Sequence, residues 1–233
     1  MMTIAVKLQG EKDEYRKLQD QLLEAEIALK EQRESVAALR RQLPMGPAVE
    51  SDYIFREGPA DIHDKSPAHF KDVRLAELFA AGKDRLIVDH MMWGPNDKSA
   101  CPMCTMWADG YNAIAPHVSQ KANFVLVAKV EIGKLRDWAR HRGWDKIRLL
   151  SSGQSSFNAD FHVEDDRGQH PGVSVFSREP DGNIHHFYTT EASLHPGPNH
   201  NPNHRGIDLY TPVWNLFDLL PEGRENWSPK LSY

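Results

Sequence analysis

Two cysteines three positions apart, Cys101 and Cys104, constrain the fold of this chain more than any other feature. They are the only cysteines among its 233 residues. The apolar run at residues 85–93 predicts a buried strand, and Gly94-Pro95 ends it. Residues 101–118 predict a helix, so the pair stands at a helix start that follows a buried strand. A disulfide that closes so short a loop adds little stability, and a redox or metal role explains the pair better.

The alternation of strands and helices continues beyond this helix. Residues 123–129 predict a second buried strand and residues 132–141 a second helix. Residues 172–176 and 184–189 predict a β-hairpin, and residues 211–220 a closing helix. A strand–helix–strand unit joins parallel strands through a right-handed crossover. Thioredoxin folds have this order, with a dithiol at the start of the first helix. We therefore predict an α/β fold, a thioredoxin-like three-layer α/β/α sandwich.

A long N-terminal helix is predicted over residues 11–43, which contain neither Pro nor Gly and end at Pro44. Its apolar seam has heptad spacing, interrupted at Gln32, and consists of Leu18, Leu22, Ala25, Leu29, Val36, Leu39 and Leu43. We predict this helix as one domain, 1–44, and a thioredoxin-like domain over 45–233. The seam either packs on its own domain or forms a homodimer through the N-terminal helix. A helix of this length projects beyond a small domain.

Composition and charge limit the classes of partner that the protein is expected to bind. A hydrophobic fraction of 40% and a net charge of -5 indicate a globular protein and argue against nucleic acid, which needs a basic face. The sequence contains no apolar run that would span a membrane and no signal-peptide pattern at its N-terminus. We expect a cytoplasmic protein without a membrane partner. Its expected partner is a disulfide-containing protein or a small-molecule thiol or disulfide.

The helix start favours thiolate chemistry. A free cysteine is mostly protonated at neutral pH, whereas the N–H groups and partial positive charge of a helix N-terminus stabilise a thiolate. We expect Cys101, the more exposed cysteine, to attack a substrate disulfide, and Cys104 to resolve the mixed disulfide. Pro102 suits the first helical turn, and Met103 is neutral. Both lie where substrate would bind.

Half of a zinc site is the alternative explanation of the cysteine pair. Structural zinc takes four ligands, and the other candidates are histidines such as His200 and His204, about a hundred residues downstream. The His-rich loop 195–204 could be a transition-metal site, but it contains no Asp, Glu or Cys and is more typical of a solvated polar loop. We therefore expect no metal and no cofactor.

A peroxidase motif is almost present. Peroxiredoxins carry Pro, three residues, Thr or Ser, two residues and then the attacking Cys. Pro95 and Ser99 precede Cys101, but each is one position too close. The residue types match the motif and the spacing does not.

Two further positions are candidate site residues. Pro171 precedes the alternating strand that begins at Gly172, where thioredoxin folds carry a cis-proline that faces the dithiol and binds extended substrate. We expect Pro171 and Gly172 to bind substrate in this way, although an ordinary trans turn proline is the alternative. Asp109 is a possible proton acceptor for Cys104, with a surface carboxylate as the alternative.

Segments along nearly the whole chain are similar to a bacterial thioredoxin-like family, domain of unknown function 899. The residues that carry this resemblance are Leu39–Pro44, Asp52–Phe55, Gly94-Pro95, Cys101–Asp109, Gly143-Trp144, Ser151-Ser152, Phe157-Asn158, Asp160-Phe161, Pro171–Phe176, Arg205–Asp208, Pro212–Asn215, Asp218 and Pro221–Arg224. The resemblance implies a thioredoxin-like fold and a dithiol–disulfide oxidoreductase role. It does not identify a substrate.

Three functional hypotheses follow. The first is a thiol–disulfide oxidoreductase that uses the Cys-Pro-Met-Cys dithiol. The second is a thiol peroxidase or redox sensor that uses the same cysteines. The third is a non-catalytic, dimeric binding module whose interface is the N-terminal helix.

Overall fold

The computed structural model describes residues 9–153, 155–190, 213, 216, 219–220 and 227–232. Contacts between Cα atoms divide the chain into two compact units, Met1–Pro44 and Met45–Tyr233. The predicted loop 195–204 lies outside the described residues, as does most of the predicted closing helix 211–220. No helix in the described part of the chain is long and apolar enough to cross a membrane.

The first unit contains the long helix α1, Asp13–Arg41, which confirms the predicted helix with two residues fewer at each end. Acidic residues occupy its first turn and basic residues its last, and these charges stabilise the helix through their interaction with its dipole. None of its residues is buried. The apolar seam of α1 is therefore exposed within the described part of the chain.

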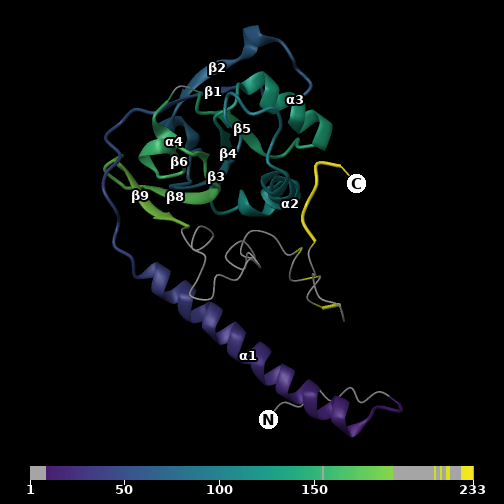
Figure 1. Ribbon diagram of the computed structural model, residues 1–233. Coiled ribbons are helices and arrows are strands. Elements are labelled where there is room, and N and C mark those ends of the chain that lie inside the picture. The colour runs from purple at the N-terminus through teal and green to yellow at the C-terminus, as the bar shows by residue number, and fades with distance from the viewer. Residues whose placement is uncertain are drawn as a thin grey trace. The chain divides into compact units, whose positions relative to one another are not determined.

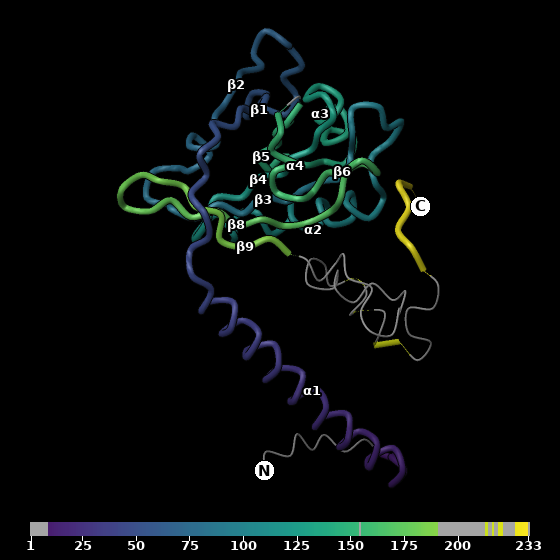
Figure 2. Tube along the Cα trace, turned by 60° about the vertical axis from the view of Figure 1, so that its left-hand side comes forward, coloured from purple at the N-terminus to yellow at the C-terminus, as the bar shows by residue number. Residues whose placement is uncertain are grey.

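The second unit is built on a sheet of seven described strands in the order β2-β1-β5-β4-β3-β8-β9. The strands are β1 (Ile54–Glu57), β2 (Lys71–Arg74), β3 (Arg85–Met91), β4 (Asn123–Ala128), β5 (Arg148–Ser151), β8 (Gly172–Arg178) and β9 (Ile184–Thr189). Strands β3, β4 and β5 are parallel, and β8 and β9 continue the sheet in antiparallel pairs. Figure 2 shows the turn of the β8–β9 hairpin as a projecting loop.

Helices cover the sheet on both faces, which makes the predicted three layers. On one face lie α2 (Pro102–Val118) and α3 (Ile132–Arg142) (Figure 1). The core cluster on this face contains side chains such as Leu126 and Leu149. On the other face, Val88 and Val125 belong to a second core cluster. That cluster also contains residues of the 3-10 helix η2 (Leu75–Leu78) and of the short helix α4 (Phe157–Asp160). The alternation of side chains along each strand separates the two clusters.

The strand and helix order is that of a thioredoxin-like fold. The units β3-α2-β4 and β4-α3-β5 are consecutive parallel crossovers, and β8 returns beside β3 in the antiparallel direction. Two right-handed crossovers that proceed in one direction place both helices on the same face, as observed for α2 and α3. The fold class predicted from the sequence is confirmed, including the long N-terminal helix.

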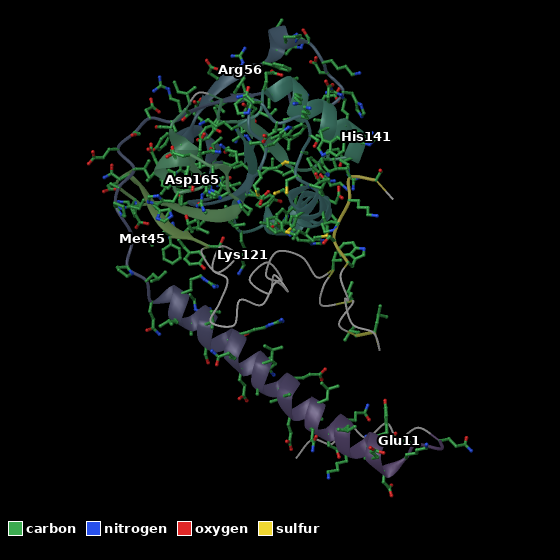
Figure 3. All side chains as sticks on the ribbon, in the orientation of Figure 1. Glu11, Met45, Arg56, Lys121, His141 and Asp165 are labelled. Atoms are coloured by element: carbon green, nitrogen blue, oxygen red, sulfur yellow. The ribbon has the colours of Figure 1, made fainter. Side chains whose placement is uncertain are left out.

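Some elements were not predicted from the sequence. The segment that contains β2 and the 3-10 helix η1 (Pro67–His69) has the sequence of a loop, but the structure contains these two elements there. The short hairpin of β6 (Glu164–Asp165) and β7 (Gly168–Gln169), on which Asp165 is labelled in Figure 3, was also missed. These elements are two to four residues long, too short for a periodic pattern of apolar residues to emerge.

Candidate dithiol site

The two cysteines lie where the sequence predicts, at the start of α2. Cys101 is the N-cap residue, with an extended backbone (φ -65°, ψ 126°), and Pro102 occupies the first turn. The backbone N–H of Cys104 donates to the Cys101 sulfur, with an N···S distance of 3.4 Å. A sulfur atom here takes the place of the side-chain oxygen that usually caps a helix. Both cysteines are free thiols.

The two thiols ionise very differently. The hydrogen bond from the Cys104 thiol, aided by backbone N–H groups of Cys104 and Met103, lowers the pKa of the half-buried Cys101 from 9.0 to about 6, although burial opposes this. The same hydrogen bond, together with burial, raises the pKa of Cys104 well above 9.0. Only 1% of the Cys104 surface is exposed. At neutral pH Cys101 is therefore mainly a thiolate and Cys104 a thiol.

The rate of alkylation should reveal this asymmetry. We expect Cys101 in the reduced, folded protein to react with iodoacetamide at a rate that is half-maximal near pH 6, because only the thiolate is nucleophilic. Cys104 should stay unmodified over the same range. Mass spectrometry of peptides after timed quenching measures each site, and the chain unfolded in denaturant is the control, in which both cysteines should titrate near pH 8.5. Equal profiles for the two sites in the folded chain would contradict the assignment.

A buried carboxyl group, Asp89, belongs to the same site. It lies on β3 with 0% of its surface exposed, and neither carboxyl oxygen has a hydrogen-bond partner among the described residues. Burial, with a smaller contribution from the charge of Cys101, raises the pKa of Asp89 from 3.8 to about 8. Asp89 also contributes to the raised pKa of Cys104. Asp89 was not among the site residues predicted from the sequence, although an acidic residue inside an apolar run is a signal of such a site.

The loop between β3 and α2 is fastened at several points. The Asp97 carboxylate accepts a hydrogen bond from the backbone N–H of Gly94 at 2.6 Å. From α3, the Lys134 ammonium donates to the Asp97 carbonyl oxygen at 2.7 Å and lies 5.2 Å from the centre of the Trp93 ring. These contacts hold the segment that leads into Cys101.

Asp109 has a different role from the predicted one. Its carboxylate forms an ion pair with Arg142 at the end of α3 and accepts a hydrogen bond from Nε1 of Trp144 at 2.8 Å. Trp144 is almost fully buried in the core between the sheet and these helices. Asp109 thus joins α2 to α3, and the carboxyl group that interacts electrostatically with Cys104 is Asp89.

We expect Asp109→Ala to destabilise the fold and to spare the thiol chemistry. The substitution removes the ion pair and leaves Nε1 of Trp144 buried without its acceptor, which costs about 2–3 kcal/mol of unfolding free energy. Urea unfolding measures this loss. The alkylation profile of Cys101 should stay unchanged, and a shifted midpoint would show that Asp109 acts on the dithiol after all.

Pro171 and Gly172 lie at the start of β8. Gly172 is buried and pairs with His90 near the end of β3, the strand that leads towards Cys101. No peptide bond between described residues is cis, so the cis-proline predicted at Pro171 is wrong and its trans alternative holds. The backbone N–H of His170 donates to the carbonyl of Val163 at 2.8 Å, which ties the segment before Pro171 to the residues preceding β6.

Pro102 and Met103 occupy the turn between the cysteines. Pro102 is exposed, whereas Met103 is half-buried and packs on the core cluster that contains Cys104. Other half-buried side chains that pack on this cluster include Cys101 itself, Met92, Met106 and Trp138. Among the described residues, no group of three or more His, Cys, Asp or Glu side chains is arranged to hold a metal ion.

Comparison with solved structures gives matches to peroxiredoxins. One is the peroxidoxin BcpB from Mycobacterium tuberculosis, with 18% identity and a TM-score of 0.42 over 61% of this chain and 83% of that one. Another is a cysteine-to-serine mutant of PrxQ from Xylella fastidiosa, with 11% identity and a TM-score of 0.46 over 64% and 85%. No curated protein sequence matches the chain.

A family model gives the broadest match. It is described as a bacterial protein of unknown function, DUF899, and it matches residues 6–232. The matched range includes the dithiol and every strand of the sheet. The protein is therefore a member of the bacterial family DUF899, and its fold is thioredoxin-like.

Proposed function

We propose that the protein is a thiol–disulfide oxidoreductase that uses Cys101 and Cys104. The observation that carries the proposal is the pairing of a half-buried Cys101 with a pKa of about 6 and a buried Cys104 with a raised pKa. Disulfide exchange needs a thiolate to attack and a second thiol, withheld until the mixed disulfide has formed, to complete the reaction. The hydrogen bonds at the helix start supply the thiolate, and the burial of Cys104 withholds the second thiol.

The reaction has two steps. The Cys101 thiolate attacks one sulfur of the substrate disulfide, which forms a Cys101–substrate disulfide and releases the other substrate sulfur as a thiolate that takes a proton from water. Cys104 then loses its proton and attacks the Cys101 sulfur, which forms the Cys101–Cys104 disulfide and releases the second substrate thiol. The substrate gains two electrons and the dithiol loses two. A thiol donor reverses the change in the protein.

Asp89 is the proposed proton acceptor for the second step. A carboxyl group with a pKa near 8 is partly ionised at neutral pH and can take the Cys104 proton as the thiol becomes a nucleophile. Once Cys101 is in a mixed disulfide its negative charge is gone, and the charge that helped to raise the pKa of Asp89 is removed. The carboxylate is then easier to form at the moment when it is needed.

The proposed substrate is a disulfide flanked by apolar groups, in a protein or a small molecule. Pro102 and Met103 would contact it beside Cys101, and Pro171 and Gly172 would contribute from the start of β8. Half-buried Met92, Met103 and Met106 pack on the same cluster as Cys104, and methionines adapt to varied apolar surfaces. We place the reaction in the cytoplasm, where such a dithiol is kept reduced.

The test is a trap. Cys104→Ser leaves Cys101 able to attack but removes the group that releases the product, so the variant should accumulate a mixed disulfide with an added protein disulfide substrate. The adduct appears as a band on non-reducing gels that dithiothreitol removes, and mass spectrometry should locate it at Cys101. The double variant Cys101→Ser with Cys104→Ser is the control. If the folded Cys104→Ser variant formed no adduct, and Cys101 reacted only after the chain was unfolded in denaturant, the proposal would be rejected.

A further inference from the structure

We propose that α1 binds α1 of a second copy of this chain as an antiparallel two-stranded coiled coil. The inference is independent of the proposed function, because it concerns only the first unit. It starts from the side of α1 that carries apolar residues at heptad spacing, which we call the seam and which consists of Leu18, Leu22, Ala25, Leu29, Val36, Leu39 and Leu43.

The seam is exposed along its whole length. The exposed fractions of Leu22, Leu29 and Leu39 are 56%, 54% and 66%, and no residue of α1 is buried by the described part of the chain. Figure 3 shows the side chains of α1 projecting all round the helix. A row of exposed leucines is an apolar patch of the kind that marks an interface.

Heptad spacing favours a second helix as the occupant. Residues that alternate at intervals of four and three keep one narrow stripe on the helix, and such a stripe packs knobs into holes against a stripe of the same kind. Two copies of this chain supply identical stripes. In heptad notation, Leu22, Leu29 and Val36 are at a positions, and Ala25 and Leu39 are at d positions.

The charges of α1 favour the antiparallel orientation. Residues 13–26 contain five acidic and two basic side chains, whereas residues 28–41 contain four basic and two acidic ones. A parallel pair would place the acidic halves side by side and the basic halves side by side. An antiparallel pair places each acidic half against a basic half, which is favourable at the distances found between paired helices.

The flanking positions identify one register. Alignment of Leu22 with Leu39 of the second copy also aligns Ala25 with Val36, a small residue against a larger one. In this register Glu26 faces Arg33 of the second copy, at the e positions beside the seam, and symmetry repeats the pair. A parallel pair would instead bring Glu26 beside the neutral Gln21, with no opposite charges in contact.

Light scattering of the full-length protein tests the association. The unaltered chain should show twice the mass of one chain, and Leu29→Glu should show the mass of a single chain at the same concentration. Ile27→Glu is the matched control, because Ile27 is also exposed, at 47% against 54% for Leu29, but lies on the opposite side of the helix from the seam. It should leave the dimer intact. Far-UV circular dichroism checks that α1 remains helical. A monomeric unaltered chain, or a dimer that survives Leu29→Glu, would overturn the proposal.

Engineered cysteines test the orientation. With Cys101 and Cys104 both replaced by serine, Leu22→Cys alone and Leu39→Cys alone should each give little cross-linked dimer on oxidation. A mixture of the two variants should cross-link efficiently, because residues 22 and 39 face each other in the antiparallel register. Efficient cross-linking of Leu22→Cys to itself would show a parallel pair and reject the proposal.

A charge reversal tests the register. Glu26→Lys should weaken self-association by roughly 3- to 10-fold, because two repulsive pairs replace two attractive ones. Adding Arg33→Glu should restore the affinity. Residues 26 and 33 are seven positions apart in one helix and do not touch within it, so rescue must act between copies. Weakening by Glu26→Lys without rescue by the second change would exclude this register.

Discussion

Cys101→Ser is expected to abolish disulfide reduction by the protein. At pH 7 Cys101, with a pKa of about 6, is mostly thiolate, whereas Cys104, with a pKa well above 9.0, is less than about 1% ionised. The substitution removes the hydrogen bond and the charge of Cys101 that help to raise the pKa of Cys104, but burial still raises that pKa, so the remaining cysteine stays mainly protonated at pH 7. Burial of Cys104 adds to this, because an incoming disulfide cannot reach its sulfur. We expect a total loss of about 100-fold or more.

The measurement is a single-turnover assay. The protein is first reduced and freed of excess thiol. It is then mixed with a small disulfide such as Ellman's reagent, and the thiol that the reagent releases is followed by its absorbance. Cys104→Ser is the comparison, since it keeps Cys101 for the first step and should release one equivalent of thiol. Equal rates for the unaltered protein and Cys101→Ser would remove the proposed chemistry. Hydrogen peroxide consumption far above that of a free thiol would favour a peroxidase instead.

Asp89→Asn is expected to stabilise the protein at neutral and alkaline pH. The unfolded chain releases the Asp89 proton above its ordinary pKa of 3.8, whereas the folded chain holds it up to about pH 8. Between these values the folded state binds more protons, so the stability contributed by this group falls as the pH rises. Each pH unit is worth about 1.4 kcal/mol, and the buried site gives an expected gain of about 3–5 kcal/mol for Asn at pH 8.

The difference between variant and unaltered protein isolates this effect. Cys101, whose pKa is lowered from 9.0 to about 6, contributes the opposite slope between those pH values in both proteins. Urea unfolding of reduced samples at several pH values should show a stability difference that is small at pH 4 and largest near pH 8. Asp166→Asn, at an exposed carboxylate, is the control for the loss of one carboxyl group. A flat profile for Asp89→Asn would mean that Asp89 is ionised in the fold.

The same variant tests the proposed proton transfer. If Asp89 takes the Cys104 proton, Asp89→Asn should slow the release of the mixed disulfide but leave the attack by Cys101 largely unaffected. The variant should therefore have a higher unfolding free energy at neutral pH and a lower rate of release of the mixed disulfide.

The sequence predicted the central elements because each carries a long, regular pattern. Strand β3, helix α2 and the crossover to β4 follow from apolar runs and a helix start, and the predicted hairpin strand 184–189 matches β9. Helix α1 follows from 33 residues without Pro or Gly. The dithiol was placed correctly because its position depends only on local order: strand, break, cysteine, helix.

The carboxyl partner of the dithiol could not be assigned in the same way. Asp109 is five positions after Cys104, and five residues turn a helix by roughly 140°, so the two side chains point to different sides of α2. Asp89 is 15 positions before Cys104 and comes close only because α2 packs on the strand that carries it. Side chains alternate along β3, so Asp89 lies on the same face as Met91, which belongs to the core cluster beneath α2 and α3. This alternation is the signal in the sequence that places Asp89 on the dithiol side of the sheet.

The trans bond before Pro171 has a related explanation. The expected cis bond rested on the general pattern of the fold rather than on any local residue. In this chain the β6–β7 hairpin precedes the proline, and the hydrogen bond from His170 to Val163 sets the path of the chain there. A short element that is invisible in the sequence pattern thus lies directly before a strand that the pattern predicts well.

The sulfur cap on α2 has an electrochemical consequence. The hydrogen bond from the Cys104 thiol and, to a smaller extent, the backbone N–H groups of the cap stabilise the Cys101 thiolate. This thiolate exists only in the reduced protein, since the oxidised protein has no charge on the sulfur. A pKa of about 6 in place of 9.0 favours the reduced form by roughly 1.4 kcal/mol at pH 7, which corresponds to about 30 mV for a two-electron couple. The first turn of α2 thereby makes the couple more oxidising than a dithiol without these hydrogen bonds would be, and more so as the pH rises towards 9.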